Sequence, residues 1–285
     1  MQYKKNVKFF FPTECVFLHQ ILSKYKSMTP QAIFFDIDGT LVSFKTHSIP
    51  ASAKEAINRL RDKGIKVIIA TGRALCDIDN LEDLEFDGFI TANGTCCYDD
   101  KGAVIAQHLL SRESLDKIAK YLEVNQYPCA FMTTKGNFIN FADERVISLG
   151  QLVNVPTPPV KPFSELIEYE IFQVGVFVDL EGEAELLNLL PDCESSRWHP
   201  DFTDINVKNC NKATGMDCML EYFGISRDFS MAFGDGGNDL SMLKHAATGI
   251  AMGNGNDEVK AVADYVTTSV DDDGIVNALK YYKVL

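Results

Sequence analysis

Two aspartates, Asp36 and Asp38, stand at the end of a short apolar run, within the stretch FDIDGTL of residues 35–41. Side chains two positions apart on extended backbone point to the same side, and Gly39 allows the chain to turn sharply after them. A buried pair of like charges is costly unless a cation or a substrate lies between them, which disfavours a purely structural role. The pair therefore predicts a site for a cation or a substrate where this run ends.

Other metal sites share this short pattern. An EF-hand loop beginning at Asp36 would need a bidentate Glu at its twelfth position, where this chain has His47, and it would not follow a strand. The EF-hand interpretation is therefore disfavoured. The metal-binding Asp-x-Asp of sugar-nucleotide transferases stays open at this point, because the short motif alone does not exclude it.

A second polar group, Thr71-Gly72-Arg73, follows the apolar run 65–70. It brings a hydroxyl, a flexible backbone N–H and a guanidinium to one point, as phosphate recognition requires. Alone this signal is weak, because Thr-Gly often simply ends a strand.

A third group, FGDGGND at 233–239, also follows an apolar run and places Asp235 and Asp239 four positions apart, with Asn238 between them. Its glycines allow close approach of the backbone to a ligand. An acidic turn would explain one aspartate but explains the whole string poorly. Lys212 precedes this group and, taken alone, reads as a solvated surface lysine.

Apolar runs alternate with amphipathic helices around these motifs, which is typical of an α/β fold with a doubly wound, Rossmann-like parallel sheet. The strands expected in this core are 32–35, 65–70, 89–92, 231–234, 249–252 and 265–267, with helices near 50–64 and 213–223. Three of the motifs therefore fall at the carboxyl ends of parallel strands, where an open α/β sheet places its ligand crevice. Asp36, Asp38 and Asp235 would supply oxygen ligands for Mg²⁺, and Thr71 and Lys212 would donate to a phosphate.

The segment between the first and the last three of these strands has a different sequence pattern. It contains a probable hairpin, short strands, two helices and a proline-rich connection at 156–162. We expect residues 100–195 to form an inserted α+β cap domain, with the core at 31–99 and 196–285. Residues 1–30 read as an N-terminal extension: residues 1–27 carry five Lys and one Glu, unlike the acidic remainder. Met28 is a candidate natural start.

With these motifs in this order, the sequence resembles the haloacid dehalogenase superfamily, and within it the Cof-like sugar-phosphatase branch with an α+β cap of type IIB. The resemblance covers residues 31–285. It implies that Asp36 is the nucleophile that forms an aspartyl-phosphate and that Asp38 is the general acid and base. It further implies phosphate contacts from Thr71, Gly72, Lys212 and Asn238, and a Mg²⁺ site made by Asp36, the Asp38 carbonyl and Asp235, with Asp239 acting on the metal's water shell or on Lys212. The branch usually has Lys-Gly where this chain has Lys212-Ala213, and Asn-Gly-Ala where it has Asn93-Gly94-Thr95.

The function expected is Mg²⁺-dependent hydrolysis of small phosphate monoesters, with sugar phosphates as the first candidates. Expelling an alkoxide requires a proton whereas expelling a halide does not, so the second acid, Asp38, favours phosphatase over dehalogenase chemistry. The cap would close over the strand ends and contact the rest of the substrate. A phosphomutase of the same superfamily and a non-enzymatic receiver-like phospho-acceptor module are the alternatives.

Asn93 at the core–cap junction and Arg73 are the candidate substrate contacts outside the phosphate site. Arg145 and the run Arg197-Trp198-His199 are further candidates, but a structural role is the simpler interpretation for these four. The sequence does not separate a sugar phosphate from a nucleotide or pyridoxal phosphate.

The amino-acid composition disfavours some classes of binding partner. The formal net charge of -13 and the pI near 4.8 disfavour nucleic acid and anionic membranes as partners. The eight scattered cysteines form no C-x-x-C pair, and no apolar stretch approaches the ~18 to 20 residues of a membrane span. We therefore expect a cytoplasmic enzyme that acts on a small phosphorylated metabolite without an obligate protein partner.

Overall fold

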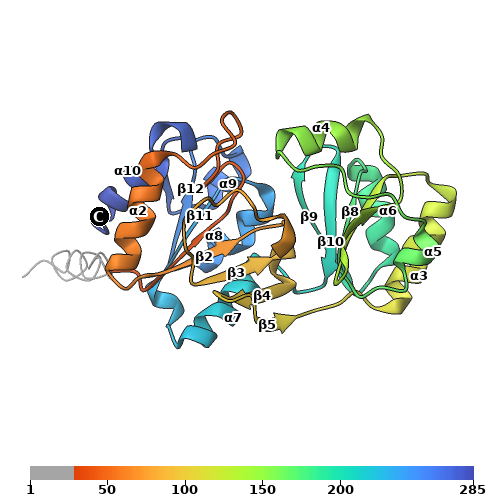
Figure 1. The fold of residues 1–285 in the computed structure, drawn as a ribbon, viewed down its shortest axis with the longest axis horizontal. Coiled ribbons are helices and arrows are strands. Elements are labelled where there is room, and N and C mark those ends of the chain that lie inside the picture. Colours follow the sequence, from red (N-terminus) through yellow and green to blue (C-terminus); the bar gives the residue numbers. More distant parts are fainter. Residues whose placement is uncertain (1–28) are drawn as a thin grey trace, which may run out of the picture.

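The computed structural model describes residues 29–285, arranged as a larger core domain and a smaller cap domain (Figure 1). The predicted N-terminal extension, residues 1–30, and the candidate start Met28 lie outside the described residues, except for Thr29 and Pro30.

The core is built on an eight-stranded sheet whose order is β13-β12-β11-β1-β2-β3-β4-β5. All neighbours from β13 to β3 are parallel, and β3, β4 and β5 pair antiparallel. The strands are β1 (Ala32–Phe35), β2 (Lys66–Ala70), β3 (Gly88–Thr91), β4 (Cys96–Asp99), β5 (Val104–Gln107), β11 (Ser230–Gly234), β12 (Thr248–Ala251) and β13 (Tyr265–Val266). Because β1 lies between β11 and β2, the strand order reverses beside it, as in a doubly wound fold.

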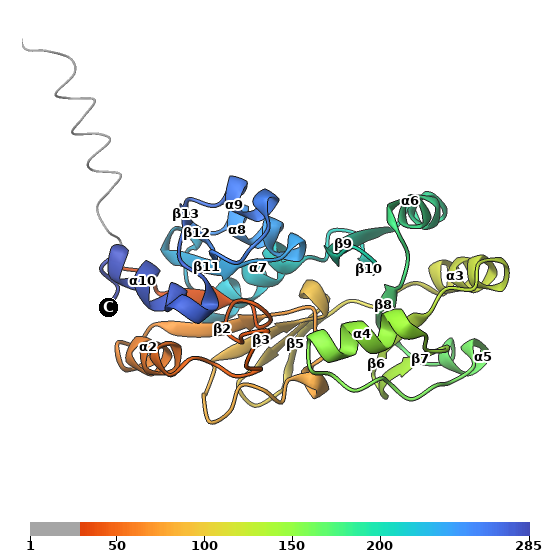
Figure 2. The same ribbon diagram turned by 90° about the horizontal axis from the view of Figure 1, so that it is seen from above.

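Helices cover both faces of the core sheet (Figure 2). On one face, α2 (Ala51–Asp62) and α10 (Gly274–Tyr281) pack against a cluster that includes Ile33 and Phe35. On the other face, α7 (Lys212–Phe223), α8 (Leu240–His245) and α9 (Asp257–Val262) pack against a cluster that includes Phe34. Successive residues of β1 thus pack into the apolar clusters on opposite faces of the sheet, which explains why this strand is apolar throughout. A mainly parallel sheet covered by helices on both faces confirms the predicted α/β class.

The cap has its own five-stranded antiparallel sheet in the order β7-β6-β8-β10-β9. Its strands are β6 (Cys129–Thr133), β7 (Gly136–Ile139), β8 (Ile171–Val176), β9 (Cys193–His199) and β10 (Phe202–Val207). Helices α3 (Arg112–Val124), α5 (Phe163–Leu166) and α6 (Leu180–Leu189) share one apolar cluster with the sheet, and α4 (Glu144–Leu152) belongs to another. An α+β cap was the prediction from sequence, although α4, β9 and β10 were not among the predicted elements.

The two sheets place the domain boundaries later than the predicted 100 and 195. Strand β5 at 104–107 still belongs to the core sheet, because it forms a hairpin with β4 that continues the sheet beyond β3. Strands β9 and β10 extend to Val207 and both belong to the cap sheet. The chain therefore enters the cap between β5 and α3 and returns to the core between β10 and α7.

Two further features concern the described residues as a whole. Their seven cysteines are free, and five of them are buried. No helix in residues 29–285 is both long and apolar enough to cross a membrane.

Candidate active site

The three predicted motifs meet at one edge of the core sheet. Asp36, Thr71 and Asp235 each directly follow a strand, and these strands, β1, β2 and β11, are parallel neighbours. Phe35 of β1 is in register with Ile69 of β2 and Phe233 of β11, so the three polar residues emerge side by side. This edge is where an open α/β sheet binds its ligand.

Lys212 is buried within this edge and is not the solvated lysine that its sequence context alone suggests. Its side chain is fully buried, and its Nζ lies 2.6 Å from Asp36 Oδ1 and 2.6 Å from Asp239 Oδ1. Lys212 is the first residue of α7, whose N-terminus is fixed by a capping box between Asn211 and Thr214. Burial alone would lower the pKa of Lys212, but Asp239 and Asp36 outweigh it and raise that pKa above its ordinary value.

Three carboxylates crowd around this single ammonium group. Oxygen atoms of Asp36, Asp235 and Asp239 all lie within 4.8 Å of one another. Burial raises the pKa of Asp36 to about 7 even though Lys212 opposes the shift, and burial together with Asp36 and Asp239 raises the pKa of Asp235 well above its ordinary value. Such a cluster favours a bound cation, and its oxygen donors suit Mg²⁺.

The contacts of Asp239 separate its role from those of Asp36 and Asp235. Its Oδ1 accepts from Lys212, and its Oδ2 accepts from the backbone N–H groups of Asp235 and Gly236 at 2.8 and 2.9 Å. Asp239 thus fixes the lysine and the turn that carries Asp235. Asp36 and Asp235 therefore remain as the carboxylates best placed to contact a metal ion directly.

The turn after β1 fits closely around Asp235. Thr40 Oγ1 donates to Asp235 Oδ1 at 2.8 Å. Gly39 has φ +87°, and a Cβ atom at this position would lie 2.3 Å from Asp235 Oδ2. Both the backbone conformation and the lack of space therefore require glycine here, as the sharp turn predicted from the sequence implied.

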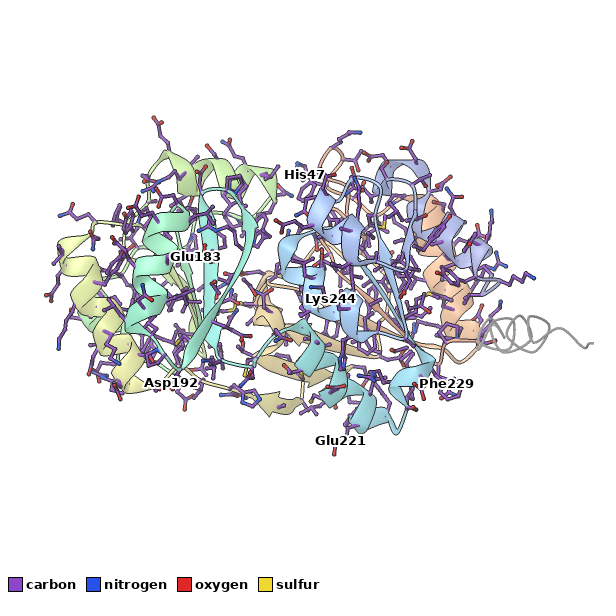
Figure 3. The ribbon with its side chains drawn as sticks, turned by 180° about the vertical axis from the view of Figure 1, so that it is seen from behind. His47, Glu183, Asp192, Glu221, Phe229 and Lys244 are labelled. Carbon is purple, nitrogen blue, oxygen red and sulfur yellow. The ribbon has the colours of Figure 1, made fainter. Side chains whose placement is uncertain are left out.

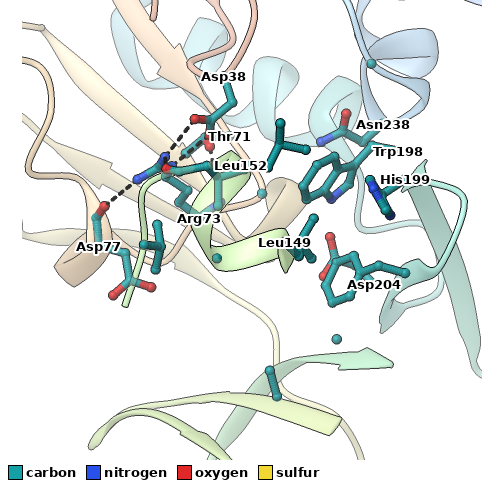
Figure 4. A pocket seen from close by; sticks show the side chains of 18 of the residues that line it. Asp38, Thr71, Arg73, Asp77, Leu149, Leu152, Trp198, His199, Asp204 and Asn238 are labelled. Atoms are coloured by element: carbon teal, nitrogen blue, oxygen red, sulfur yellow. Dashed lines mark hydrogen bonds and ion pairs between the residues drawn. The ribbon is translucent and has the colours of Figure 1, made fainter. Parts of the chain in front are cut away.

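Asp38 faces Arg73 across the mouth of the crevice (Figure 4). Arg73 Nε and Nη2 donate to the two carboxylate oxygens of Asp38, each at 2.7 Å. Nη2 also donates to the carbonyl oxygen of Val153 in the cap at 2.7 Å, and Nη1 donates to that of Asp77 at 3.1 Å. Arg73, predicted as a substrate contact, is thus bound to the predicted general acid and to the cap.

The phosphate-binding candidates line the same crevice. Thr71, Gly72 and Asn238 contribute to the cavity wall together with Asp36 and Asp38. The hydroxyl oxygen of Thr71 accepts from the backbone N–H of Arg73, which leaves the hydroxyl proton available for a ligand. The site therefore offers hydroxyl, amide and backbone donors around Asp36.

Asn93 forms the centre of a buried polar network between core and cap. It lies in the turn η2 (Ala92–Gly94) with a positive φ of 54°, and its side chain is fully buried. Its Nδ2 donates to Gln173 Oε1 at 3.0 Å and to Asp204 Oδ2 at 2.8 Å, while its Oδ1 accepts from Asn238. The contacts of Asn93 thus link Asn238, in the third motif, to the cap sheet.

Gln173 and Asp204 were not predicted from the sequence. Gln173 Nε2 donates to Asp204 Oδ1 at 2.7 Å, and burial raises the pKa of Asp204 to about 7. Gln173 is the one polar residue in the otherwise apolar strand β8, which is a sequence signal that could have identified it. Strand β10, FTDINV, is half polar, so the sequence gives no comparable signal for Asp204.

A cavity of about 400 Å³ lies between these core residues and the cap (Figure 4). Trp198 and His199 line it, although the sequence favoured structural roles for both. Arg145 and Arg197 do have structural contacts. Arg145 binds Asp143 and the Phe177 carbonyl, and Arg197 binds Glu183. Figure 3 shows Glu183 on α6.

Fold and site together define a capped, doubly wound α/β protein with a cluster of aspartates at the carboxyl ends of its central strands. The family model for haloacid dehalogenase-like hydrolases matches residues 33–279, and the chain belongs to this family. The chain is an enzyme with the phosphatase activity of that family, acting on small phosphorylated substrates.

Three similar proteins illustrate the match. The HAD subclass IIB sugar phosphatase BT4131 has a solved structure with TM-score 0.86 and 41% identity, covering 90% of this chain and 100% of that one. The "Putative phosphatase YkrA" of Bacillus subtilis (strain 168) is 33% identical over 89% of this chain and 98% of its own. The 5-amino-6-(5-phospho-D-ribitylamino)uracil phosphatase YcsE of the same organism is 29% identical over 88% and 94%.

Proposed function

We propose that this enzyme is a Mg²⁺-dependent phosphatase that hydrolyses small phosphate monoesters through a phosphoryl group carried on Asp36. The observation that carries the proposal is the position of Asp36: its carboxylate is nearly buried, lies 2.6 Å from Lys212 Nζ and still lines the cavity. A nucleophile needs this combination of a fixed orientation and access to substrate.

Asp36 would attack the phosphorus atom and displace the alcohol, while Asp38 gives a proton to the departing oxygen. Asp38 would then take a proton from water, which attacks the aspartyl-phosphate, releases inorganic phosphate and regenerates Asp36. Both oxygens of Asp38 are bound by Arg73. Each oxygen keeps a second lone pair, through which Asp38 can exchange a proton with substrate or water.

Asp36 and Asp235, with the backbone carbonyl of Asp38, would hold Mg²⁺, which supplies positive charge to the phosphoryl oxygens when bound. Lys212, Thr71, the Gly72 backbone and Asn238 would bind and orient the phosphoryl group. Asp239 would keep Lys212 charged and in place, as its 2.6 Å contact with the ammonium supports.

Two observations favour an enzyme acting on esters over the receiver-like module. Asp38 provides the second acid that an alkoxide leaving group needs, and the cap borders a cavity large enough for a small metabolite. A phosphomutase shares these groups but returns the phosphoryl group to its substrate, so phosphate release separates it from a phosphatase. Sugar phosphates, the substrate class named for the related BT4131, are the first class to test. A cytoplasmic location and the lack of an obligate partner stay predictions.

The experiment is a panel of phosphorylated hexoses, pentoses, nucleotides and pyridoxal phosphate, assayed for inorganic phosphate with Mg²⁺ and with excess EDTA. We expect release from at least one ester with Mg²⁺, and its loss with EDTA. Undiminished release in EDTA would contradict the metal assignment. No release from any ester would favour the phosphomutase or the receiver-like module.

A further inference from the structure

The cap side of the cavity is predominantly apolar. Val146 and Leu149 of α4 form a cluster with Phe177 and Phe202, and Trp198 packs against that cluster. All five residues line the cavity, opposite the core aspartates. Figure 4 shows Leu149, Leu152 and Trp198 projecting into the space between Arg73 and the cap sheet. The part of a substrate beyond its phosphate would therefore contact mainly carbon atoms.

This apolar surface is extended by Gly175. A Cβ atom at Gly175 would lie 2.6 Å from the ring of Phe202, so the missing side chain allows that ring to lie across β8. Phe202 in turn packs edge to face against Phe177, with ring centroids 4.9 Å apart, and against Trp198 at 5.8 Å. The aromatic side chains thus form one continuous group facing the cavity.

Several polar groups on this wall are already engaged, although Asn137 Oδ1 has no hydrogen-bond partner among the described residues. Both oxygens of Asp204 accept hydrogen bonds, from Asn93 and Gln173, and Gln173 Oε1 accepts from Asn93. His199 Nδ1 accepts from the backbone N–H of Asp201. Among the described residues that the cap contributes to the cavity, none is Lys, Arg or Glu. Few cap groups therefore remain to bind the hydroxyls of a sugar.

The apolar surface of this wall and its shortage of free polar groups determine which alcohol portion of a phosphate ester binds well. A hydroxyl transferred from water to a site without a partner loses hydrogen bonds, which is unfavourable. Apolar surface transferred to the same site is stabilised in proportion to the area removed from water. A free hexose would place several hydroxyls against this wall, whereas a flat apolar ring would complement it.

We propose that, given the phosphatase function above, the preferred substrates are phosphomonoesters whose alcohol carries an apolar ring, which binds against α4, Trp198 and Phe202. The ring binds in the cap while the phosphate binds to the core motifs. Cap residues thus select the ester, and the core performs the same chemistry on each one.

The first test compares primary alkyl phosphates, so that the leaving groups have similar reactivity. Benzyl phosphate and pyridoxal 5′-phosphate carry a flat aromatic ring, whereas the rings of glucose 6-phosphate and ribose 5-phosphate are saturated and bear hydroxyls. We expect kcat/KM to be at least about tenfold higher for the two aromatic esters, mainly through a lower KM. Equal or better turnover of the sugar phosphates would overturn the proposal and leave the phosphatase function intact. No turnover of any ester would instead count against the phosphatase function.

The second test changes the wall itself. Leu152 lies at the cavity edge and is 39% exposed, so Leu152→Asn adds a polar group there with little effect on folding. Leu189 on α6 is 44% exposed, does not line the cavity and gives the matched control Leu189→Asn. We expect Leu152→Asn to lower kcat/KM about fivefold for benzyl phosphate but not for ribose 5-phosphate, and the control to change neither. An equal loss on both esters would contradict the proposal.

A binding measurement separates recognition from catalysis. Trp198 is the only tryptophan of the chain, so its fluorescence reports on the cavity. Asp36→Asn, which cannot form the phosphoenzyme, allows titration at equilibrium. We expect benzyl phosphate to change this fluorescence at a concentration at least about tenfold lower than ribose 5-phosphate does. Equal concentrations for the two esters would contradict the assignment of the ring to this wall.

Discussion

Arg73 binds both carboxylate oxygens of Asp38 and, through the same guanidinium group, the carbonyl oxygen of Val153 in the cap. Burial would lower the pKa of Arg73, but its hydrogen bonds and proximity to Asp38 outweigh burial and raise it, so the guanidinium stays charged. The orientation of the proposed general acid is therefore tied to the position of the cap. Cap closure and the geometry of proton transfer should respond together to changes at residue 73.

Replacing Arg73 by Lys tests this coupling. Lysine keeps the charge but cannot bind two carboxylate oxygens and a carbonyl in one plane. We expect kcat for an alkyl phosphate to fall about 10- to 100-fold, with a smaller loss for an aryl phosphate. Arg61→Lys is the control, because the Arg61 side chain pairs with Glu85 at the surface of α2 and does not line the cavity. Steady-state kinetics with equal losses for both variants would show that Arg73 has no such role.

Asp38→Asn tests the proposed proton transfer. Alkyl leaving groups need a proton and aryl leaving groups depart without one, so activity on alkyl phosphates should fall by about 10²- to 10⁴-fold and activity on aryl phosphates less. The measurement is kcat/KM for both ester types under identical Mg²⁺ conditions. Equal losses on the two types would assign Asp38 another role, such as positioning the metal.

Mg²⁺ should stabilise the folded protein through Asp36 and Asp235. A ligand present at about 100 times its dissociation constant adds about 2.7 kcal/mol, which corresponds to a rise in Tm of roughly 5 °C or more for a chain of this size. Asp235→Asn should lose most of this rise, while its Tm in EDTA stays at or above that of the wild type, because the crowding that raises the pKa of Asp235 is relieved. A Mg²⁺-induced rise of the same size in the variant would exclude Asp235 as a ligand.

Asp204 should make the stability of the metal-free protein depend on pH. Its pKa is about 7 in the folded protein and 3.8 in the reference state, so between these values the folded state binds the extra proton. The contribution of Asp204 to the free energy of unfolding is therefore present at low pH. It is lost as the pH rises toward 7, by at most about 1.4 kcal/mol per pH unit.

The measurement is urea unfolding in EDTA at several values between pH 5 and 7. The free energy of unfolding of Asp204→Asn should decline with rising pH less steeply than that of the wild type, by about 1 kcal/mol per pH unit. The control is Asp201→Asn, at an exposed aspartate in the turn between β9 and β10. Its free energy of unfolding should decline as that of the wild type does. Parallel curves for the wild type and Asp204→Asn would contradict the assigned protonation of Asp204.

Much of the core could be predicted because its signals are local. Apolar runs that end in Asp36, Thr71 and Asp235 identify both the parallel strands and the edge of the sheet where these residues meet. The resemblance implied that Lys212 contacts the phosphate, but nothing in the sequence predicted its burial, because a lysine at a helix start is usually exposed. The carboxylates that surround it come from positions 176 and 27 residues away.

The cap was harder to predict because its contacts join segments that are distant in the sequence. Strand β9 alternates poorly, so the sequence did not indicate which sheet residues 193–207 join. The network of Asn93, Gln173 and Asp204 depends on pairing between β8 and β10 and on docking of the cap to the core. The pairing of Arg73 with Asp38 joins two loops 35 residues apart. None of these contacts leaves a local pattern in the sequence.

Asp36 is proposed to carry the phosphoryl group, and trapping the phosphoryl group on the protein would identify the residue that carries it. Asp38→Asn should still form the aspartyl-phosphate from an aryl phosphate but hydrolyse it slowly, because the base that activates water is missing. Acid quench during turnover of phosphorus-labelled p-nitrophenyl phosphate, followed by peptide mapping, should then locate the label on Asp36. The double variant Asp36→Asn/Asp38→Asn should carry no label. Multiple turnovers by Asp38→Asn without label on Asp36, or label on another residue, would contradict the mechanism.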